Sequence, residues 1–216
     1  MAEIVPAINV ESFEEVVRRI RIAEPHVRCV HIDVADGSFT PRAVWHNAEE
    51  LKNFQTPLFI EIHFMVDEPE EKIAPWLLTP AKKIIFHIES ARDVDRVIDD
   101  IHGARKEAAL AVRPDTSWEA LVPYAGRVDM LQTLAVPPGP SGQECDQRTV
   151  EKIKNLRARF PKTPIEVDGG VRVGVARACA DAGADFIVVG SSLFSPESKF
   201  QEKLKALRDD IALVHS

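Results

Sequence analysis

Short apolar runs, of the length of buried strands, alternate along the chain with longer segments whose apolar residues repeat as in amphipathic helices. Eight short apolar runs are expected to form strands, at residues 3–9, 29–36, 58–66, 83–90, 108–113, 128–136, 165–169 and 186–190. In the segments between them, apolar residues recur at spacings of three and four. The clearest stripes are Phe13, Val16, Val17 and Ile20, then Val94, Val97, Ile98 and Ile101, and then Val150, Ile153, Leu156 and Phe160.

Three of the segments between strands contain a residue pair typical of a helix start. The pairs are Ser12 with Glu15, Thr116 with Glu119, and Asp67 with Pro69. The first two have the spacing of a capping box, in which each side chain bonds the backbone N–H of the other residue. In the third, the aspartate is expected to cap the helix and the proline to lie in its first turn.

Strict alternation of strands and helices implies parallel strands joined by right-handed crossovers. Eight such units can close into a barrel that has no open sheet edge. The alternative is an open, doubly wound sheet, which often has a glycine-rich turn after its first strand. Residues 9–12 contain no such turn, and no linker divides the chain. We therefore expect an α/β protein with a single (β/α)8 TIM-barrel domain spanning residues 1–216.

Composition and charge limit the classes of partner. The formal net charge of −7 argues against nucleic acid, because a phosphate backbone requires a basic surface. No apolar run approaches the roughly 18 residues that span a bilayer, and the first residues lack a signal-peptide pattern. Cys29, Cys145 and Cys179 are far apart, so a disulfide framework is not expected. We expect a cytoplasmic protein with neither a membrane nor a nucleic-acid partner.

Ionisable residues interrupt the apolar pattern on four of the expected strands. Within each strand they share one face, because side chains alternate with a period of two. The sets are His31 with Asp33, Glu61 with His63, His87 with Glu89, and Glu166 with Asp168. Barrel interiors are normally filled with Val, Ile and Leu, and a buried charge is costly unless it is paired or binds a metal. The pattern indicates a cation near the carboxyl ends of the strands.

Each pair taken alone has a simpler interpretation. A lone His-x-Asp on a strand is more often a hydrogen-bonded structural pair than a metal site. His87 and Glu89 are more readily interpreted as support for neighbouring ligands. Two imidazoles and two carboxylates on three strands of one barrel nevertheless favour a divalent transition metal.

Glycine-rich loops follow the last three expected strands. They contain Gly139 and Gly142 after the sixth strand, Gly169 and Gly170 after the seventh, and Gly190 after the eighth. Barrels commonly hold phosphate on backbone N–H groups of their last loops, and glycine allows the close approach that this requires. One glycine pair alone is usually a turn, but three successive loops of this kind predict a phosphate site.

These motifs together resemble the ribulose-phosphate 3-epimerase family over nearly the whole chain. The matching segments are residues 31–37 (HIDVADG), 62–66 (IHFMV), 138–143 (PGPSGQ), 166–171 (EVDGGV) and 190–191 (GS). The resemblance implies a TIM barrel of the ribulose-phosphate-binding type. It also implies one divalent metal ion, usually Zn²⁺ or Fe²⁺, with Co²⁺ and Mn²⁺ as alternatives.

The resemblance further implies roles for individual residues. The metal ligands would be His31, Asp33, His63 and Asp168, and the catalytic acid/base groups would be Asp33 and Asp168. The substrate would be bound by His63, Gly139, Pro140, Ser141, Gly142, Asp168, Gly169, Gly170, Gly190 and Ser191.

The implied reaction interconverts D-ribulose 5-phosphate and D-xylulose 5-phosphate in the pentose phosphate pathway. Two bases would move the C3 proton through an enediolate that the metal stabilises. Family members form homo-oligomers, so we expect this chain to do so.

The sequence departs from the family pattern among residues near the substrate. The departures are Ala7, Asn9, Arg42, Arg113 and Ser141. They leave open an epimerase for another ketose phosphate, such as a ketohexose 6-phosphate, and a non-catalytic protein that binds a sugar phosphate or a metal. A related barrel decarboxylase is a further alternative, but its Asp-x-Lys-x-x-Asp motif is absent at residues 33–36.

Overall fold

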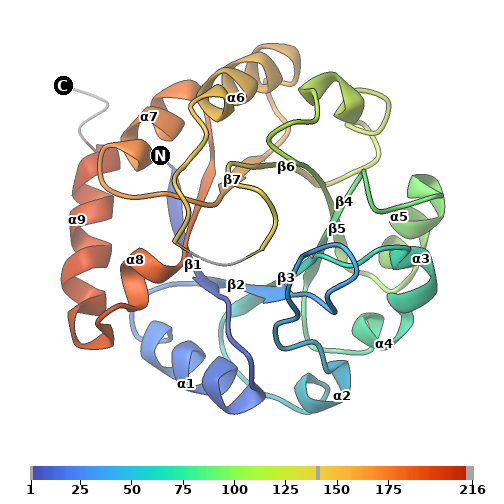
Figure 1. The fold of residues 1–216 in the computed structure, drawn as a ribbon, viewed down its shortest axis with the longest axis horizontal. Helices are drawn as coiled ribbons and strands as arrows, with labels where there is room; N and C mark the ends of the chain where they lie inside the picture. Colours follow the sequence, from blue (N-terminus) through green and yellow to red (C-terminus); the bar gives the residue numbers. More distant parts are fainter. Residues whose placement is uncertain (1, 140–141, 213–216) are drawn as a thin grey trace.

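Eight parallel strands close into one barrel, and helices cover its outside (Figure 1). The computed structural model describes residues 2–139 and 142–212. Each strand pairs with its neighbours in sequence, and the first strand pairs with the eighth to complete the ring. The predicted α/β class and TIM-barrel fold are confirmed.

The strands lie at the eight positions expected from the sequence. They are β1 (Glu3–Ile8), β2 (Cys29–Val34), β3 (Phe59–Phe64), β4 (Lys83–His87), β5 (Glu107–Val112), β6 (Met130–Leu134), β7 (Ile165–Asp168) and β8 (Phe186–Val189). Every expected run extends one to three residues past the observed carboxyl end. The excess arises because apolar and site-lining residues continue into the loops after the last strand hydrogen bonds.

The helical elements lie between the strands in sequence. They are α1 (Phe13–Ala23), α2 (Ala48–Leu51), α3 (Pro69–Lys72), α4 (Ala74–Leu77), α5 (Val94–Gly103), η1 (Trp118–Leu121), α6 (Arg148–Arg159), α7 (Val175–Ala182), α8 (Ser191–Phe194), η2 (Glu197–Lys199) and α9 (Phe200–Ala212). Among the described residues, none of these helices has both the length and the apolar character that crossing a membrane requires.

Two of the three predicted helix starts agree with the structure at least in part. The hydroxyl of Ser12 accepts the backbone N–H of Glu15 at 3.3 Å and caps α1, as predicted. Pro69 is the first residue of α3, but the N-cap position belongs to Glu68 instead of Asp67.

The predicted capping box of Thr116 and Glu119 is wrong. The segment forms only the short 3₁₀ helix η1, and Ser117 lies at its N-cap position without a side-chain cap. Pro123 follows the end of η1 and cannot supply the N–H that a longer helix would need. A capping-box spacing therefore occurs here without a helix long enough to use it.

The main apolar core lies between the barrel and its helices. Ile32 and Ile62 on the strands, and Ile20 and Ile98 on the helices, belong to this core and are 0% exposed. Inside the barrel, apolar side chains form only small clusters, such as the one around Ile85. Much of the remaining interior is filled by buried histidine, carboxylate, lysine and glutamine side chains. The fold thus places its polar residues on the barrel axis.

Candidate active site

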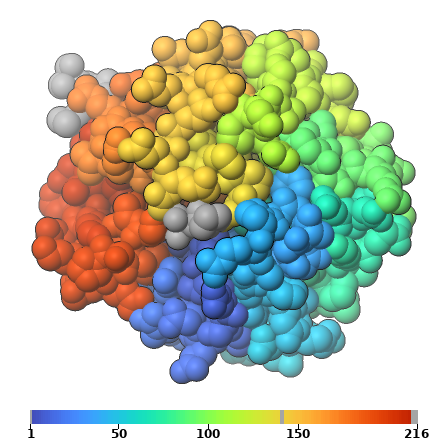
Figure 2. Space-filling view, in the orientation of Figure 1, coloured from blue at the N-terminus to red at the C-terminus, as the bar shows by residue number. Residues whose placement is uncertain are grey.

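A cavity of about 300 Å³ opens at the carboxyl ends of the strands, where barrels of this type carry their functional loops. Its lining comes from the carboxyl-terminal parts of β1, β2, β6 and β7 and from the segments that follow β1, β3, β6, β7 and β8. In Figure 2 the light-blue segment near residue 40 and the yellow segment after β6 meet over the centre of the barrel. Arg42 and Gly139, from these two segments, line a smaller cavity together with Asn9.

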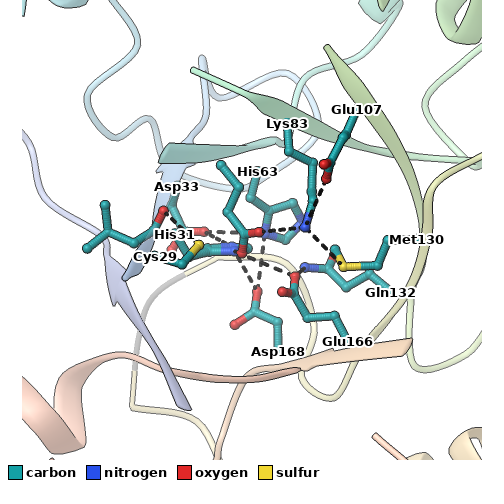
Figure 3. A network of polar contacts seen from close by, with 12 residues as sticks. Cys29, His31, Asp33, His63, Lys83, Glu107, Met130, Gln132, Glu166 and Asp168 are labelled. Carbon is teal, nitrogen blue, oxygen red and sulfur yellow. Dashed lines mark hydrogen bonds and ion pairs between the residues drawn. The ribbon is translucent and has the colours of Figure 1, made fainter. Parts of the chain in front are cut away.

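The four predicted metal ligands come together beside this cavity (Figure 3). His31 and Asp33 lie on β2, His63 lies on β3, and Asp168 ends β7. His63 Nδ1 lies 3.1 Å from Asp168 Oδ2 and 3.3 Å from Asp33 Oδ1. His31 Nε2 lies 3.5 Å from Asp33 Oδ1 and 3.7 Å from Asp168 Oδ2. The period-two pattern therefore identified residues whose side chains lie close together in the structure.

The cluster has the spacing and the unsatisfied atoms expected of a cation site. A tetrahedral ion with bonds of about 2.1 Å separates its ligand atoms by roughly 3.4 Å, close to the distances observed here. His31 Nε2, Asp33 Oδ1 and His63 Nδ1 are buried and have no hydrogen-bond partner among the described residues. Buried polar atoms without partners are rare, and these three lie together. The cluster could therefore hold a metal ion.

The pKa values of the cluster follow from its own contacts. Burial alone would lower the pKa of His31, but the neighbouring carboxylates of Asp33 and Glu61 hold that pKa well above its usual value. The pKa of His63 is raised as well, because Asp168 and Asp33 outweigh burial. Burial would raise the pKa of Asp33, yet the two imidazoles keep it well below its usual range. Asp33 is therefore held as a carboxylate, the form that binds metals.

His87 and Glu89 lie behind His63 and outside the cluster. His63 Nε2 lies 2.9 Å from His87 Nε2, and His87 Nδ1 lies 3.3 Å from Glu89. Burial lowers the pKa of His87 to about 4, so this ring is neutral at physiological pH. A neutral His87 can accept the Nε2–H of His63, which leaves His63 Nδ1 without a proton for a cation. The supporting role expected for this pair agrees with the geometry.

Asn9 contacts the cluster in a way that the sequence did not indicate. Its Nδ2 donates to Asp33 Oδ2 at 2.8 Å, while Asp33 Oδ1 faces the two histidines. The sequence marked Asn9 only as a departure from a family pattern. The contact depends on the pairing of β1 with β2, in which Ile8 lies opposite Ile32 and the next residues meet just beyond.

The glycine-rich loops border the same cavity. The predicted substrate-binding residues that line it are Gly139, Gly142, Asp168, Gly169, Gly170, Gly190 and Ser191. Pro140 and Ser141 lie outside the described residues. Gly170 has a φ of 66°, and a Cβ on it would lie 2.3 Å from the backbone nitrogen of Cys145. Glycine is therefore required where this loop passes the chain after β6.

The two arginines that depart from the family pattern each contact an acidic residue. Arg42 Nη2 lies 3.1 Å from Glu11, and both side chains are exposed. Arg113 Nε lies 3.4 Å from Asp115, and its guanidinium packs over the ring of Phe39. Neither arginine belongs to the lining of the main cavity.

Similarity to known proteins covers nearly the whole chain. Residues 3–194 match the model of the family described as "Ribulose-phosphate 3 epimerase family". A Chlamydia muridarum (strain MoPn / Nigg) protein named ribulose-phosphate 3-epimerase is 33% identical over 197 residues, covering 88% of this chain and 86% of that protein. The Oryza sativa subsp. japonica protein named "Ribulose-phosphate 3-epimerase, cytoplasmic isoform" is 31% identical, covering 84% and 82%.

The chain also resembles solved structures of proteins whose names differ from those of the relatives above. The crystal structure of 3-hexulose-6-phosphate synthase matches with a TM-score of 0.70 at 14% identity, covering 97% of this chain and 99% of that chain. At this level of identity the match shows the shared fold alone.

Proposed function

Because the chain belongs to the ribulose-phosphate 3-epimerase family, we propose that it is an isomerase that interconverts D-ribulose 5-phosphate and D-xylulose 5-phosphate. The observation that carries this proposal is a cluster of two histidines and two aspartates beside a cavity that glycine loops also border. Epimerisation at C3 removes a proton next to a ketone and returns one to the opposite face. This reaction needs acid/base groups, stabilisation of negative charge and a site that binds the phosphate.

His31, Asp33, His63 and Asp168 would hold one divalent metal ion. Mixed imidazole and carboxylate donors suit several transition metals, and we favour Zn²⁺ or Fe²⁺ over Co²⁺ or Mn²⁺. When bound, such an ion supplies Lewis acidity that stabilises negative charge on the substrate oxygens.

Asp33 and Asp168 are the proposed acid/base pair. Both line the cavity, and their side chains are 11% and 12% exposed, so each can reach bound substrate while it contacts the histidines. One carboxylate takes the C3 proton as a base, and the other delivers a proton to the opposite face as an acid. The two roles exchange with the direction of the reaction. His63 would also contact the substrate.

The phosphate would rest on backbone N–H groups of the glycine loops. The proposed N–H donors are Gly139, Ser141, Gly142, Gly169, Gly170, Gly190 and Ser191, and Pro140, which has no N–H, would contact the substrate beside them. Glycines with positive φ leave room for an anion against the backbone. Arg172, which the sequence analysis did not identify, lines the same cavity and adds a positive charge near these loops.

Proton NMR of the purified protein with D-ribulose 5-phosphate in D₂O tests the proposal. We expect the C3 proton signal to disappear as xylulose 5-phosphate forms, and both changes to stop after chelation and resume with Zn²⁺ or Fe²⁺. No exchange in metal-replete protein would overturn the assignment. Exchange that survives complete chelation would overturn only the metal part. A parallel sample with a ketohexose 6-phosphate tests the alternative substrate, which the similar proteins do not favour.

We also expect a cytoplasmic homo-oligomer. Cys29, Cys145 and Cys179 are all free thiols, as a reducing compartment would keep them, and the rice relative is named a cytoplasmic isoform. Leu78 and Val173 are exposed to 64% and 56%, which makes them natural first positions to probe for subunit contacts. Analytical ultracentrifugation of the wild type decides between a monomer and an oligomer.

A further inference from the structure

A second polar layer lies inside the barrel, next to the metal cluster and further from the cavity (Figure 3). It consists of Glu61 on β3, Lys83 on β4, Gln132 on β6 and Glu166 on β7, each at most 6% exposed. None of these groups has a part in the reaction described above. Buried ionisable groups are costly to keep, so the layer needs a physical reason.

Glu61 connects this layer to the metal cluster. One carboxylate oxygen accepts a hydrogen bond from His31 Nδ1–H at 2.8 Å, and the other accepts one from Lys83 Nζ at 3.1 Å. Lys83 also lies 3.7 Å from Glu107, whose side chain is 49% exposed. A continuous line of contacts therefore runs from the surface through Lys83 and Glu61 to a metal ligand.

Glu166 is close to His31, but its carboxylate is too far from the ring for a hydrogen bond. Its Oε1 lies 3.7 Å from His31 Nδ1 and accepts a hydrogen bond from the Gln132 amide at 2.9 Å. Burial and the neighbouring charge of Glu61 raise the pKa of Glu166 well above its usual value. Contacts distinguish the two carboxyl groups, because Glu61 bonds both His31 and Lys83 whereas Glu166 bonds Gln132.

We propose that Glu61, itself held by Lys83, is a positioning residue that fixes His31 as a metal ligand. By accepting the Nδ1–H, Glu61 holds the imidazole in the tautomer whose Nε2 lone pair faces Asp33 and Asp168. Strand register supports this arrangement, because His31 and Glu61 lie directly opposite each other on β2 and β3. The inference rests on the metal-binding part of the proposed function.

The two histidine ligands are held in different ways. On its Nε2 side, away from the aspartates, His63 contacts His87, which in turn contacts Glu89, so on that side a carboxylate acts on His63 only through a second ring. His31 contacts its carboxylate directly. Substitution of Glu61 should therefore disturb His31 and leave His63 as it is.

Titration of the metal-stripped protein with Co²⁺, followed by visible absorption, tests this role without requiring turnover. Glu61→Gln keeps the side-chain shape, removes the charge and lets an amide N–H point at His31. We expect it to weaken Co²⁺ binding by about 10–100-fold, the usual cost of losing a group that orients a metal ligand. Glu107→Gln is the matched control: it removes the other carboxylate near Lys83 without touching His31, and should bind Co²⁺ as the wild type does.

A second variant distinguishes a loss of metal binding from a folding defect. Glu61→Gln combined with Lys83→Met removes both buried charges, so no unpaired lysine remains in the barrel. We expect the double variant to lose Co²⁺ affinity as the single one does.

Nitrogen-15 NMR of the Zn²⁺-loaded, histidine-labelled protein measures the protonation of each ring nitrogen. His31 should carry its proton on Nδ1 in the wild type, and Glu61→Gln should broaden or shift only the His31 signals.

The outcomes separate this inference from the proposed function. Wild-type affinity for Co²⁺ in both Glu61 variants would overturn the inference alone. A wild-type chain that binds no Co²⁺ would overturn the metal site and the inference with it. Weaker binding in the Glu61 variants, with normal binding in Glu107→Gln, would establish the positioning role even if the protein proved to epimerise a different sugar.

Discussion

Replacing Gly170 with alanine would test whether the loop after β7 shapes the phosphate site. The residue has a φ of 66°, and an added Cβ would lie 2.3 Å from Cys145 N, 2.7 Å from Cys145 Cα and 2.8 Å from the carbonyl carbon of Glu144. All three are backbone atoms, so no side-chain rotation can relieve the overlap. The chain at residues 144–145 must retreat by roughly 1 Å to reach ordinary contact distances.

Two costs follow from this substitution. An L-residue in the left-handed region costs about 1–2 kcal/mol, which for a chain of this size lowers Tm by roughly 2–8 °C. The displaced segment includes Glu144 and lies two residues after Gly142, and both residues line the cavity beside Gly170. Loss of about 1.4 kcal/mol of phosphate binding corresponds to a tenfold weaker complex. We therefore expect KM for D-ribulose 5-phosphate to rise about tenfold or more, with a smaller change in kcat.

A coupled epimerase assay and inhibition by inorganic phosphate measure these effects. Gly126→Ala is the control, because a Cβ there meets nothing within 4 Å and the residue is exposed. The reasoning fails if Gly170→Ala folds with unchanged KM and unchanged phosphate inhibition. It also fails if Gly126→Ala alters these constants to the same extent.

Three further predictions concern the cluster and the fold. Asp33→Asn and Asp168→Asn should each lower kcat by about 10²–10⁴-fold in the same assay, and near-wild-type turnover in either would remove that residue from the acid/base pair. Because the pKa values of His31 and His63 are raised when no metal is bound, a metal ion must displace their protons, so Co²⁺ affinity should fall as pH decreases through the neutral range. Affinity independent of pH between 6 and 8 would contradict this. Ile98→Ala, in the core between α5 and the barrel, should lower the free energy of unfolding by about 2–5 kcal/mol, and a urea titration showing no loss would contradict the packing argument.

The fold could be predicted because each unit carries its own periodic signal. Strand position followed from apolar runs, and the inward face followed from polar interruptions such as His31 and Asp33. Barrel closure then required His63 and Asp168 to approach them. Local pairing was harder to predict: the spacing of Thr116 and Glu119 matches a capping box, but the segment is too short to form the helix that would use it.

Residues that act across strands could not be assigned from the sequence. Lys83 opens β4, where a lysine is usually exposed, although its period-two relation to His87 places it on the inward face. Gln132 lies in a mixed run on β6 whose inward face is ambiguous without the register. Asn9 follows β1, and its contact with Asp33 depends on where the neighbouring strand ends. In each case the missing information was the pairing between strands.

Charge balance explains how the barrel can bury so many ionisable groups. In the layer away from the cavity, the negative charge of Glu61 is offset by Lys83, and the raised pKa of Glu166 favours its neutral form. In the layer beside the cavity, the pKa values of His31 and His63 are raised, which favours protonated imidazoles beside the aspartates when no metal is bound. The proposed divalent cation would displace these protons and supply positive charge in their place, so the buried carboxylates keep a cationic partner.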